Sequence, residues 1–170
     1  IEDKGVSMSA VFKRRIVREK VLQILYAFEI NNENLLALMS TLLAEVNDEN
    51  DKKFGEELVN RVLIHKKELD DKIQERVSNW EMSRIALIDK LLLRIAICEI
   101  LYFPDIPPKV SINEVIEIAK EFSTAGSGKF INGILDAILS EEKSAGKINK
   151  SGRGLVDETV SKIRPKKPNE

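Results

Sequence analysis

The basic residues near the N-terminus form the segment best suited to bind an anion. Residues 12–20, FKRRIVREK, contain five basic residues and one acid, a net charge of +4. A guanidinium donates paired hydrogen bonds to a phosphate and offers a flat face to an unpaired base. A helix that starts here would add free backbone amides. The segment predicts contact with RNA, and a solvated basic surface is the alternative. The candidate residues are Lys13, Arg14, Arg15 and Arg18.

The segment GSGKF at residues 126–130 is a second candidate for anion binding. It is not a phosphate loop of the Walker type, because Ser123 stands where the first glycine is needed and Phe130 replaces the required serine or threonine. A tight turn here would instead present Lys129 and Phe130 to an anion at a helix start. For Phe130, helical spacing alone favours the alternative of packing into the core.

A helix over residues 14–30 is predicted to position the basic residues. Its apolar residues recur at helical spacing and so define one buried face. At 100° per residue, the arginines and Tyr26 share a neighbouring sector. Tyr26 lies two turns beyond Arg18, where a base could stack on it. The alternative, favoured by spacing alone, is a half-buried tyrosine within a bundle. The apolar positions are Val17, Val21, Ile24, Leu25 and Phe28.

The rest of the chain also shows helical periodicity and no convincing strand. The segment 85–102 is apolar on nearly all sides, so we expect it to be the central, buried helix. Ser111 and Glu114 match a capping box, which predicts a helix start with Ser111 as its N-cap. Residues 123–128 form an elbow between the last two helices. The predicted helices after the first cover residues 35–46, 54–77, 85–102, 112–122 and 130–139.

Two charged residues, Asp89 and Arg94, lie within the most apolar helix. A buried charge is costly unless it is paired, so an internal ion pair is the default expectation. An exposed Asp89 that faces a protein partner is the alternative.

Composition and charge divide the chain into three parts. Hydrophobic residues make up 43% of the 170 residues and aromatic residues only 5%, which favours aliphatic helix packing. We expect a flexible extension at residues 1–11, a helical domain at residues 12–142 and a basic, flexible tail at residues 143–170. The tail carries eight basic and three acidic residues, whereas residues 21–142 have a net charge of −9. Basic ends on an acidic body indicate local binding of an anion.

The residues needed for catalysis are scarce. His65 falls on an apolar stripe and Cys98 lies within the predicted buried helix, and no Cys/His cluster suits a metal. We therefore expect no enzyme activity, no cofactor and no metal site. A single cysteine fits a reducing compartment, so we expect a cytoplasmic protein. The longest apolar stretch, residues 87–103, contains four charged residues and is not expected to span a membrane.

Four motifs together resemble the NusB family of bacterial transcription antitermination factors. They are RE with QILY at residues 18–26, ID with LRIA at 88–96 and Glu99, VSINE through AK at 110–120, and KFINGILD at 129–136. The resemblance covers about residues 12–139. It implies an all-α fold, a compact bundle of about seven helices arranged as two packed three-helix bundles. It implies no catalysis.

The resemblance also implies partners and the residues that contact them. The partners are boxA-type single-stranded RNA of ribosomal RNA leader transcripts, the ribosomal protein NusE and the antitermination complex of RNA polymerase. Asp89 matches an acidic position that faces the protein partner. Ile16 and Val17 interrupt a basic segment that is often denser in this family. The matching RNA-binding positions are Lys13, Arg14, Arg15 and Arg18 in the arm, Tyr26 beside it, and Lys129 and Phe130 at the elbow.

Two other functions are compatible with the same residues. The helical domain also resembles the N-terminal RNA-binding module of ribosomal RNA cytosine methyltransferases, which would need a further α/β domain with a catalytic cysteine. A helical adaptor that binds only proteins is the third possibility. The effect of Arg14 and Arg18 on RNA affinity separates the adaptor from the RNA-binding protein.

Overall fold

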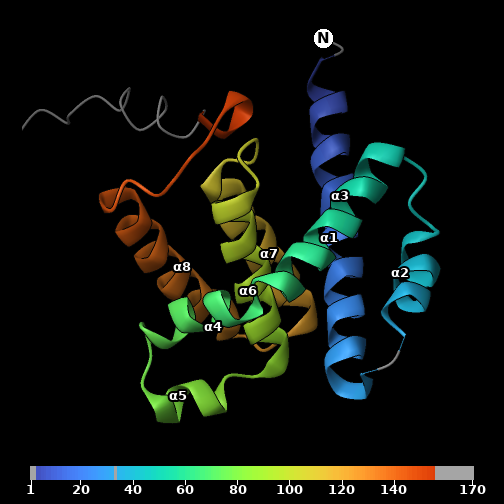
Figure 1. The fold of residues 1–170 in the computed structure, drawn as a ribbon. Coiled ribbons are helices and arrows are strands. Elements are labelled where there is room, and N and C mark those ends of the chain that lie inside the picture. The colour runs from blue at the N-terminus through green and yellow to red at the C-terminus, as the bar shows by residue number, and fades with distance from the viewer. Residues whose placement is uncertain (1–2, 33, 156–170) are drawn as a thin grey trace, which may run out of the picture.

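The computed structural model describes residues 3–32 and 34–155 of the chain. Within these residues it has eight α-helices, one short 3₁₀ helix and no strand, which confirms the predicted all-α class (Figure 1). The helices are α1 (Asp3–Asn31), α2 (Leu35–Leu43), α3 (Glu49–Ile64), α4 (Lys66–Gln74), α5 (Asn79–Arg84), α6 (Leu87–Tyr102), α7 (Pro108–Phe122), α8 (Ser127–Ser144) and the 3₁₀ helix η1 (Gly152–Leu155).

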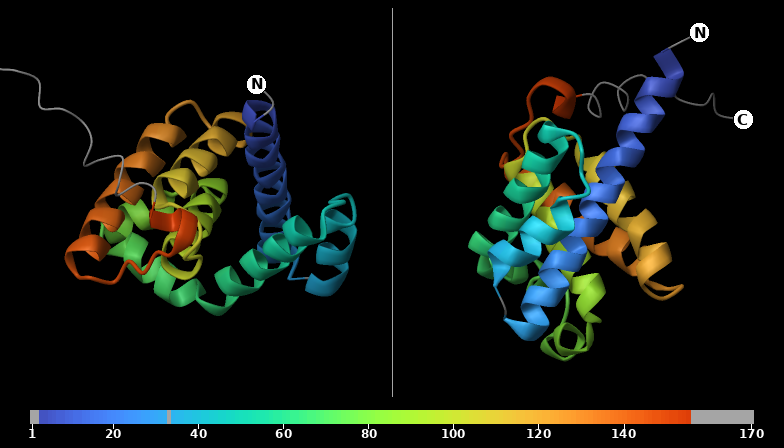
Figure 2. Two further views of the ribbon diagram at one scale, coloured as in Figure 1. Left: turned by 90° about the horizontal axis from the view of Figure 1, so that it is seen from above. Right: turned by 90° about the vertical axis from the view of Figure 1, so that its right-hand side faces the viewer.

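Helix α6 is the centre of the arrangement and contacts α1, α3, α4, α7 and α8. Helices α1, α2 and α3 contact one another, and so do α6, α7 and α8. These two groups of three helices agree with the predicted pair of three-helix bundles. Figure 1 and the left view of Figure 2 show α2 and α8 on opposite sides of the molecule. None of the helices described is long and apolar enough to cross a membrane.

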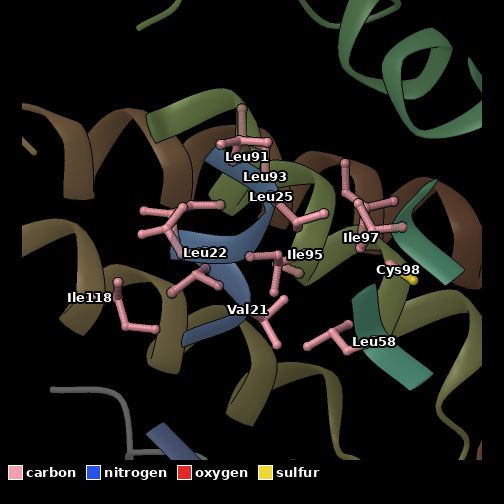
Figure 3. Close-up of a cluster of buried hydrophobic side chains, with 14 of the residues drawn as sticks. Val21, Leu22, Leu25, Leu58, Leu91, Leu93, Ile95, Ile97, Cys98 and Ile118 are labelled. Carbon is pink, nitrogen blue, oxygen red and sulfur yellow. The ribbon is translucent and has the colours of Figure 1, made fainter. Parts of the chain in front are cut away.

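The core is built almost entirely from aliphatic side chains. Residues 91–100 of α6 are all buried, as expected for the central helix. Figure 3 shows Leu93 and Ile95 of this helix beside Val21 and Leu25 of α1. Close packing of this kind fixes how α1 sits on α6. It therefore fixes which side chains of α1 reach the surface.

Helix α1 begins earlier than the sequence predicts. It starts at Asp3 rather than near Arg14, so the expected boundary between an extension and the domain at residue 12 lies inside a helix. The backbone amides at Arg14 and Arg15 are consequently bonded within the helix. The prediction that a helix start adds free amides to these arginines is therefore wrong.

The segment predicted as one helix over residues 54–77 is two helices. Helix α3 begins at Glu49, where the Asp48 side chain accepts a hydrogen bond from the backbone N–H of Asp51 (3.0 Å), and ends at Ile64. His65 separates it from α4, and its ring stacks on that of Tyr102 with 3.9 Å between centroids. His65 thus has a structural role, as its place on an apolar stripe predicted.

The predicted capping box at Ser111 and Glu114 does not form. Helix α7 begins four residues earlier than predicted, at Pro108, because proline is well suited to the first position of a helix. Ser111 and Glu114 therefore lie inside the helix, and both side chains are buried and pair with other helices. A capping box does form at Ser78 and Glu81, where it starts the short helix α5, which was not predicted from the sequence.

Part of the predicted C-terminal tail packs against α6. Helix α8 continues to Ser144, so the expected boundary at residue 143 lies within it. The Lys150 ammonium then donates to the backbone oxygens of Glu99 (3.1 Å) and Phe103 (2.8 Å). The backbone N–H of Ser151 donates to the oxygen of Pro104 at 3.1 Å. These bonds satisfy backbone acceptors at the C-terminal end of α6.

Candidate nucleic-acid interface

Lys13 and Arg14 lie on the exposed side of α1. Lys13 is exposed, and the Arg14 side chain keeps 37% of its surface in solvent. The Arg14 Nε donates to Asp51 on α3 at 2.8 Å, and the guanidinium lies 4.2 Å from the centroid of the Phe54 ring. The carboxylate and the ring hold the guanidinium against α3. Asp51 accepts from Nε, so the two Nη groups can still donate to another acceptor.

Arg15 is held by a carboxylate on another helix. Its Nε and Nη2 donate to the two oxygens of Glu114 on α7, at 2.9 and 3.0 Å. The hydrogen bonds to Glu114 raise the pKa of Arg15, so the guanidinium stays charged. Its side chain is 29% exposed. Arg15 can thus offer its remaining donors to a phosphate in a fixed orientation.

Arg18 does not lie on the surface, which corrects its predicted place in the RNA-binding arm. Its side chain is only 3% exposed and donates to both oxygens of Glu99 on α6, at 2.9 and 2.7 Å. Ser111 of α7 donates to the same carboxylate at 3.0 Å. Burial alone would lower the pKa of Arg18, but the attraction and hydrogen bonds of Glu99 raise it above its ordinary value. Arg18 joins three helices.

Tyr26 lies on the surface of α1. It is 39% exposed, so the ring is more accessible than spacing alone suggested. The side chain can accept a stacked base or an apolar contact from a partner.

The elbow between α7 and α8 brings Lys129 and Phe130 to the surface. Lys129 is exposed, and Phe130 keeps 37% of its surface in solvent. The core position is taken by the next residue, Ile131, which is fully buried. The expectation from spacing that Phe130 packs into the core is therefore wrong.

Asp89 is buried at the base of the same elbow, which corrects both predictions for it. It is 7% exposed, and its two oxygens accept hydrogen bonds from the hydroxyls of Ser123 (2.6 Å) and Ser127 (2.8 Å). It is therefore unable to face a protein partner. Arg94 does form the expected ion pair, and donates to both oxygens of Asp70 at 2.7 and 3.0 Å.

Helix α7 connects the two exposed groups. Glu114 of this helix holds Arg15, and Ser123 directly after it belongs to the elbow. Nine residues of helix separate the two positions, about 14 Å at the normal helical rise. The carboxylate partners of the arginines were not assigned from the sequence, because Asp51, Glu99 and Glu114 are distant along the chain. One available signal was Glu99, an acid on the buried helix that needs a cation.

Within the part of the chain that the structure describes, no group of His, Cys, Asp or Glu side chains is arranged to hold a metal ion. Cys98 is buried, and burial raises the pKa of its thiol well above the ordinary value. A thiol in this state is a poor nucleophile.

Comparison with known proteins identifies the family. The model of the NusB family matches residues 15–140. The transcription antitermination protein NusB of Chloroherpeton thalassium is 47% identical over 160 residues, which cover 93% of this chain and 76% of that protein. The NusB protein of Salinibacter ruber is 45% identical over 147 residues, which cover 84% of this chain and 91% of the relative. Both are matched over most of their length and named as antitermination proteins, which disfavours the methyltransferase alternative.

Solved structures have the same fold. The structure of T. maritima NusB is 36% identical, with a TM-score of 0.70 over 75% of this chain and 91% of that one. A crystal structure of NusB and NusE in complex with double-stranded RNA matches with a TM-score of 0.68 over 76% of this chain and 97% of that one. At 23% identity, that second match supports the fold alone. The chain belongs to the NusB family of transcription antitermination proteins, which are not enzymes.

Proposed function

We propose that this protein binds boxA-type single-stranded RNA of ribosomal RNA leader transcripts, together with the ribosomal protein NusE. The observation that carries the proposal is the exposed basic group on α1, formed by Lys13, Arg14 and Arg15. Two of the three cations are oriented by carboxylates before any ligand arrives, which lowers the entropy lost on binding. The N–H groups of Arg14 and Arg15 that do not bond to these carboxylates contact phosphates of the RNA.

The elbow supplies the second contact with the RNA. Lys129 gives a charge and Phe130 an exposed aromatic ring. Unpaired bases stack on aromatic side chains, with about 1–3 kcal/mol per base. Tyr26 offers a further ring on α1. The basic group would then hold the backbone, while the rings select unpaired bases.

NusE and the RNA polymerase antitermination complex are the protein partners in this proposal. Support comes from membership of the family. The NusB protein of the structural neighbour was itself crystallised with NusE and double-stranded RNA. Because Asp89 is buried, the contact with NusE lies elsewhere on the surface.

The proposal is tested by fluorescence anisotropy with a boxA-type RNA and a scrambled RNA over a series of salt concentrations, with and without NusE. We expect selective binding that becomes tighter with NusE. In the double variant Lys13→Ala/Arg14→Ala, the slope of log K against log salt should fall by about 0.7 for each phosphate that the protein no longer neutralises.

Lys67→Ala is the matched control. Lys67 is 90% exposed on α4 and pairs with Asp71 on the same helix, so the variant removes a surface charge without touching the basic group. Its RNA affinity should equal that of the wild-type protein. Equal, weak binding to both RNAs, unaffected by NusE, would overturn the proposal and favour an adaptor that binds only proteins.

A further inference from the structure

Asp89 connects the start of α6 to the elbow that precedes α8. It lies in the first turn of α6, and its carboxylate is shared by Ser123 on one side of the elbow and Ser127 on the other. The two hydroxyl oxygens are also 2.9 Å from each other, and that of Thr124 is 3.0 Å from Ser127. One buried carboxylate therefore closes a network of hydroxyl groups around the whole elbow.

This network replaces an ordinary helix cap at the start of α8. The N-cap residue, Gly126, has no side chain to accept a hydrogen bond from the first turn. A negative charge near a helix N-terminus is stabilising. Asp89 supplies one to its own helix, and Ser127, the first residue of α8, brings the same carboxylate to the second helix.

The network also fixes which side of α8 faces the solvent. Ser127 is 3% exposed and Ile131 is fully buried, so both lie on the inward side of the first turn. Lys129 is about 200° around the helix from Ser127, and Phe130 is about 60° away on the other side. A rotation of this turn would move both side chains relative to the rest of the surface.

We propose that Asp89 is a positioning residue, which holds the elbow so that Lys129 and Phe130 are directed at the RNA. This inference rests on the proposed function and assigns a role to a residue that does not itself touch the ligand. A carboxylate that only stabilised the fold would have no specific coupling to Phe130.

The test compares Asp89→Asn with Asp70→Asn. The first variant keeps the side-chain size but loses the charge and one of the two acceptor oxygens at the elbow. The second removes a carboxylate that accepts two hydrogen bonds from Arg94, on the same central helix. It therefore controls for a general loss of stability.

Two measurements decide the question. Hydrogen exchange of the free proteins should show faster exchange at residues 123–130 in Asp89→Asn but not in Asp70→Asn. In RNA anisotropy, Asp89→Asn should weaken binding by roughly twofold to 150-fold, the range expected for coupled neighbours. Phe130→Ala should then cost much less in the Asp89→Asn background than in wild type, whereas Lys13→Ala should cost the same in both.

Unchanged exchange at the elbow, or equal losses of RNA affinity in both Asn variants, would overturn the positioning role. Additive effects of Asp89→Asn and Phe130→Ala would overturn it as well. A wild-type protein that does not bind RNA would overturn the proposed function instead, and with it the RNA-directed role of Asp89. The exchange data would still show whether Asp89 holds the elbow.

Discussion

Arg15 and Arg18 are three residues apart on α1, and each forms a two-bond pair with a glutamate. Arg15 pairs with Glu114 of α7 and its side chain is 29% exposed, whereas Arg18 pairs with Glu99 of α6 and is 3% exposed. The chemistry of the two pairs is nearly identical. Their access to water differs about tenfold, and that difference separates a surface contact from a structural one.

The comparison shows why a run of basic residues cannot be treated as one site. An exposed guanidinium can exchange part of its interaction with a carboxylate for one with a phosphate, because water screens both states. A buried guanidinium cannot leave its partner without exposing an unpaired charge to the interior. Arg18 therefore holds α1 onto the core and keeps Arg15 in place one turn away.

The largest effect is expected for Arg18→Met, which leaves Glu99 buried without its cation. We expect the free energy of unfolding to fall by about 3–5 kcal/mol, measured by urea denaturation. The double variant Arg18→Met/Glu99→Met should regain most of this loss, because no unpaired charge remains. If Arg18→Met lost RNA affinity but kept its stability, Arg18 would be an RNA-binding residue and not a structural one.

A smaller effect on stability, and a direct one on RNA, is expected for Arg15→Gln. Loss of charge-assisted hydrogen bonds to Glu114 should lower the free energy of unfolding by about 1–2 kcal/mol. The salt dependence of RNA binding should weaken by about 0.7 in slope. Urea denaturation measures the free energy of unfolding, and RNA anisotropy on the same preparation measures the slope. An unchanged slope would remove Arg15 from the phosphate-binding group.

An effect that depends on pH is expected for Lys150, whose ammonium donates to the backbone oxygen of Glu99. Burial lowers the pKa of Lys150 from 10.5 to about 8, although Glu99 and Asp105 oppose the shift. Between pH 8 and 10.5 the unfolded chain then binds more protons at this residue than the folded one. The free energy of unfolding, relative to Lys150→Met, should therefore rise with pH across this window and fall as the pH drops through 8.

Titration of the lysine side chains by NMR measures the pKa of Lys150 directly. The Lys150 resonance should move near pH 8, well before the exposed Lys67, whose pKa is raised by its hydrogen bond to Asp71. The Arg18 guanidinium should stay charged throughout, because its pKa is raised. A Lys150 titration near its ordinary value would show that the ammonium is not held against α6.

Much of the fold follows from local patterns in the sequence. The spacing of Val17, Val21 and Ile24 predicts the buried face of α1, and the apolar segment at 85–102 predicts the central helix. The helix boundaries depend on competition between signals. At α7 the proline at position 108 starts the helix before Ser111 can cap it. At His65 the stacking on Tyr102, 37 residues away, accompanies the break between α3 and α4.

The candidate site was less predictable, because its geometry depends on pairs that are distant in sequence. Arg18 and Glu99 are 81 residues apart, and Arg15 and Glu114 are 99 apart. A helical wheel places both arginines on one flank and does not distinguish them. The strongest unused signal was Glu99, a third charged residue on α6 that required a partner from another helix.

The segment at residues 150–154 packs against the C-terminal end of α6, and this contact affects how cooperatively the end of that helix unfolds. The match to the family model ends at residue 140, yet Lys150 bonds to α6 and Ser151 to Pro104 just beyond its end. Gly154 lies so close to Pro104 that any side chain there would overlap its carbonyl oxygen. A protein truncated at residue 140 would retain its core but expose these carbonyls, so the last turns of α6 would fray first.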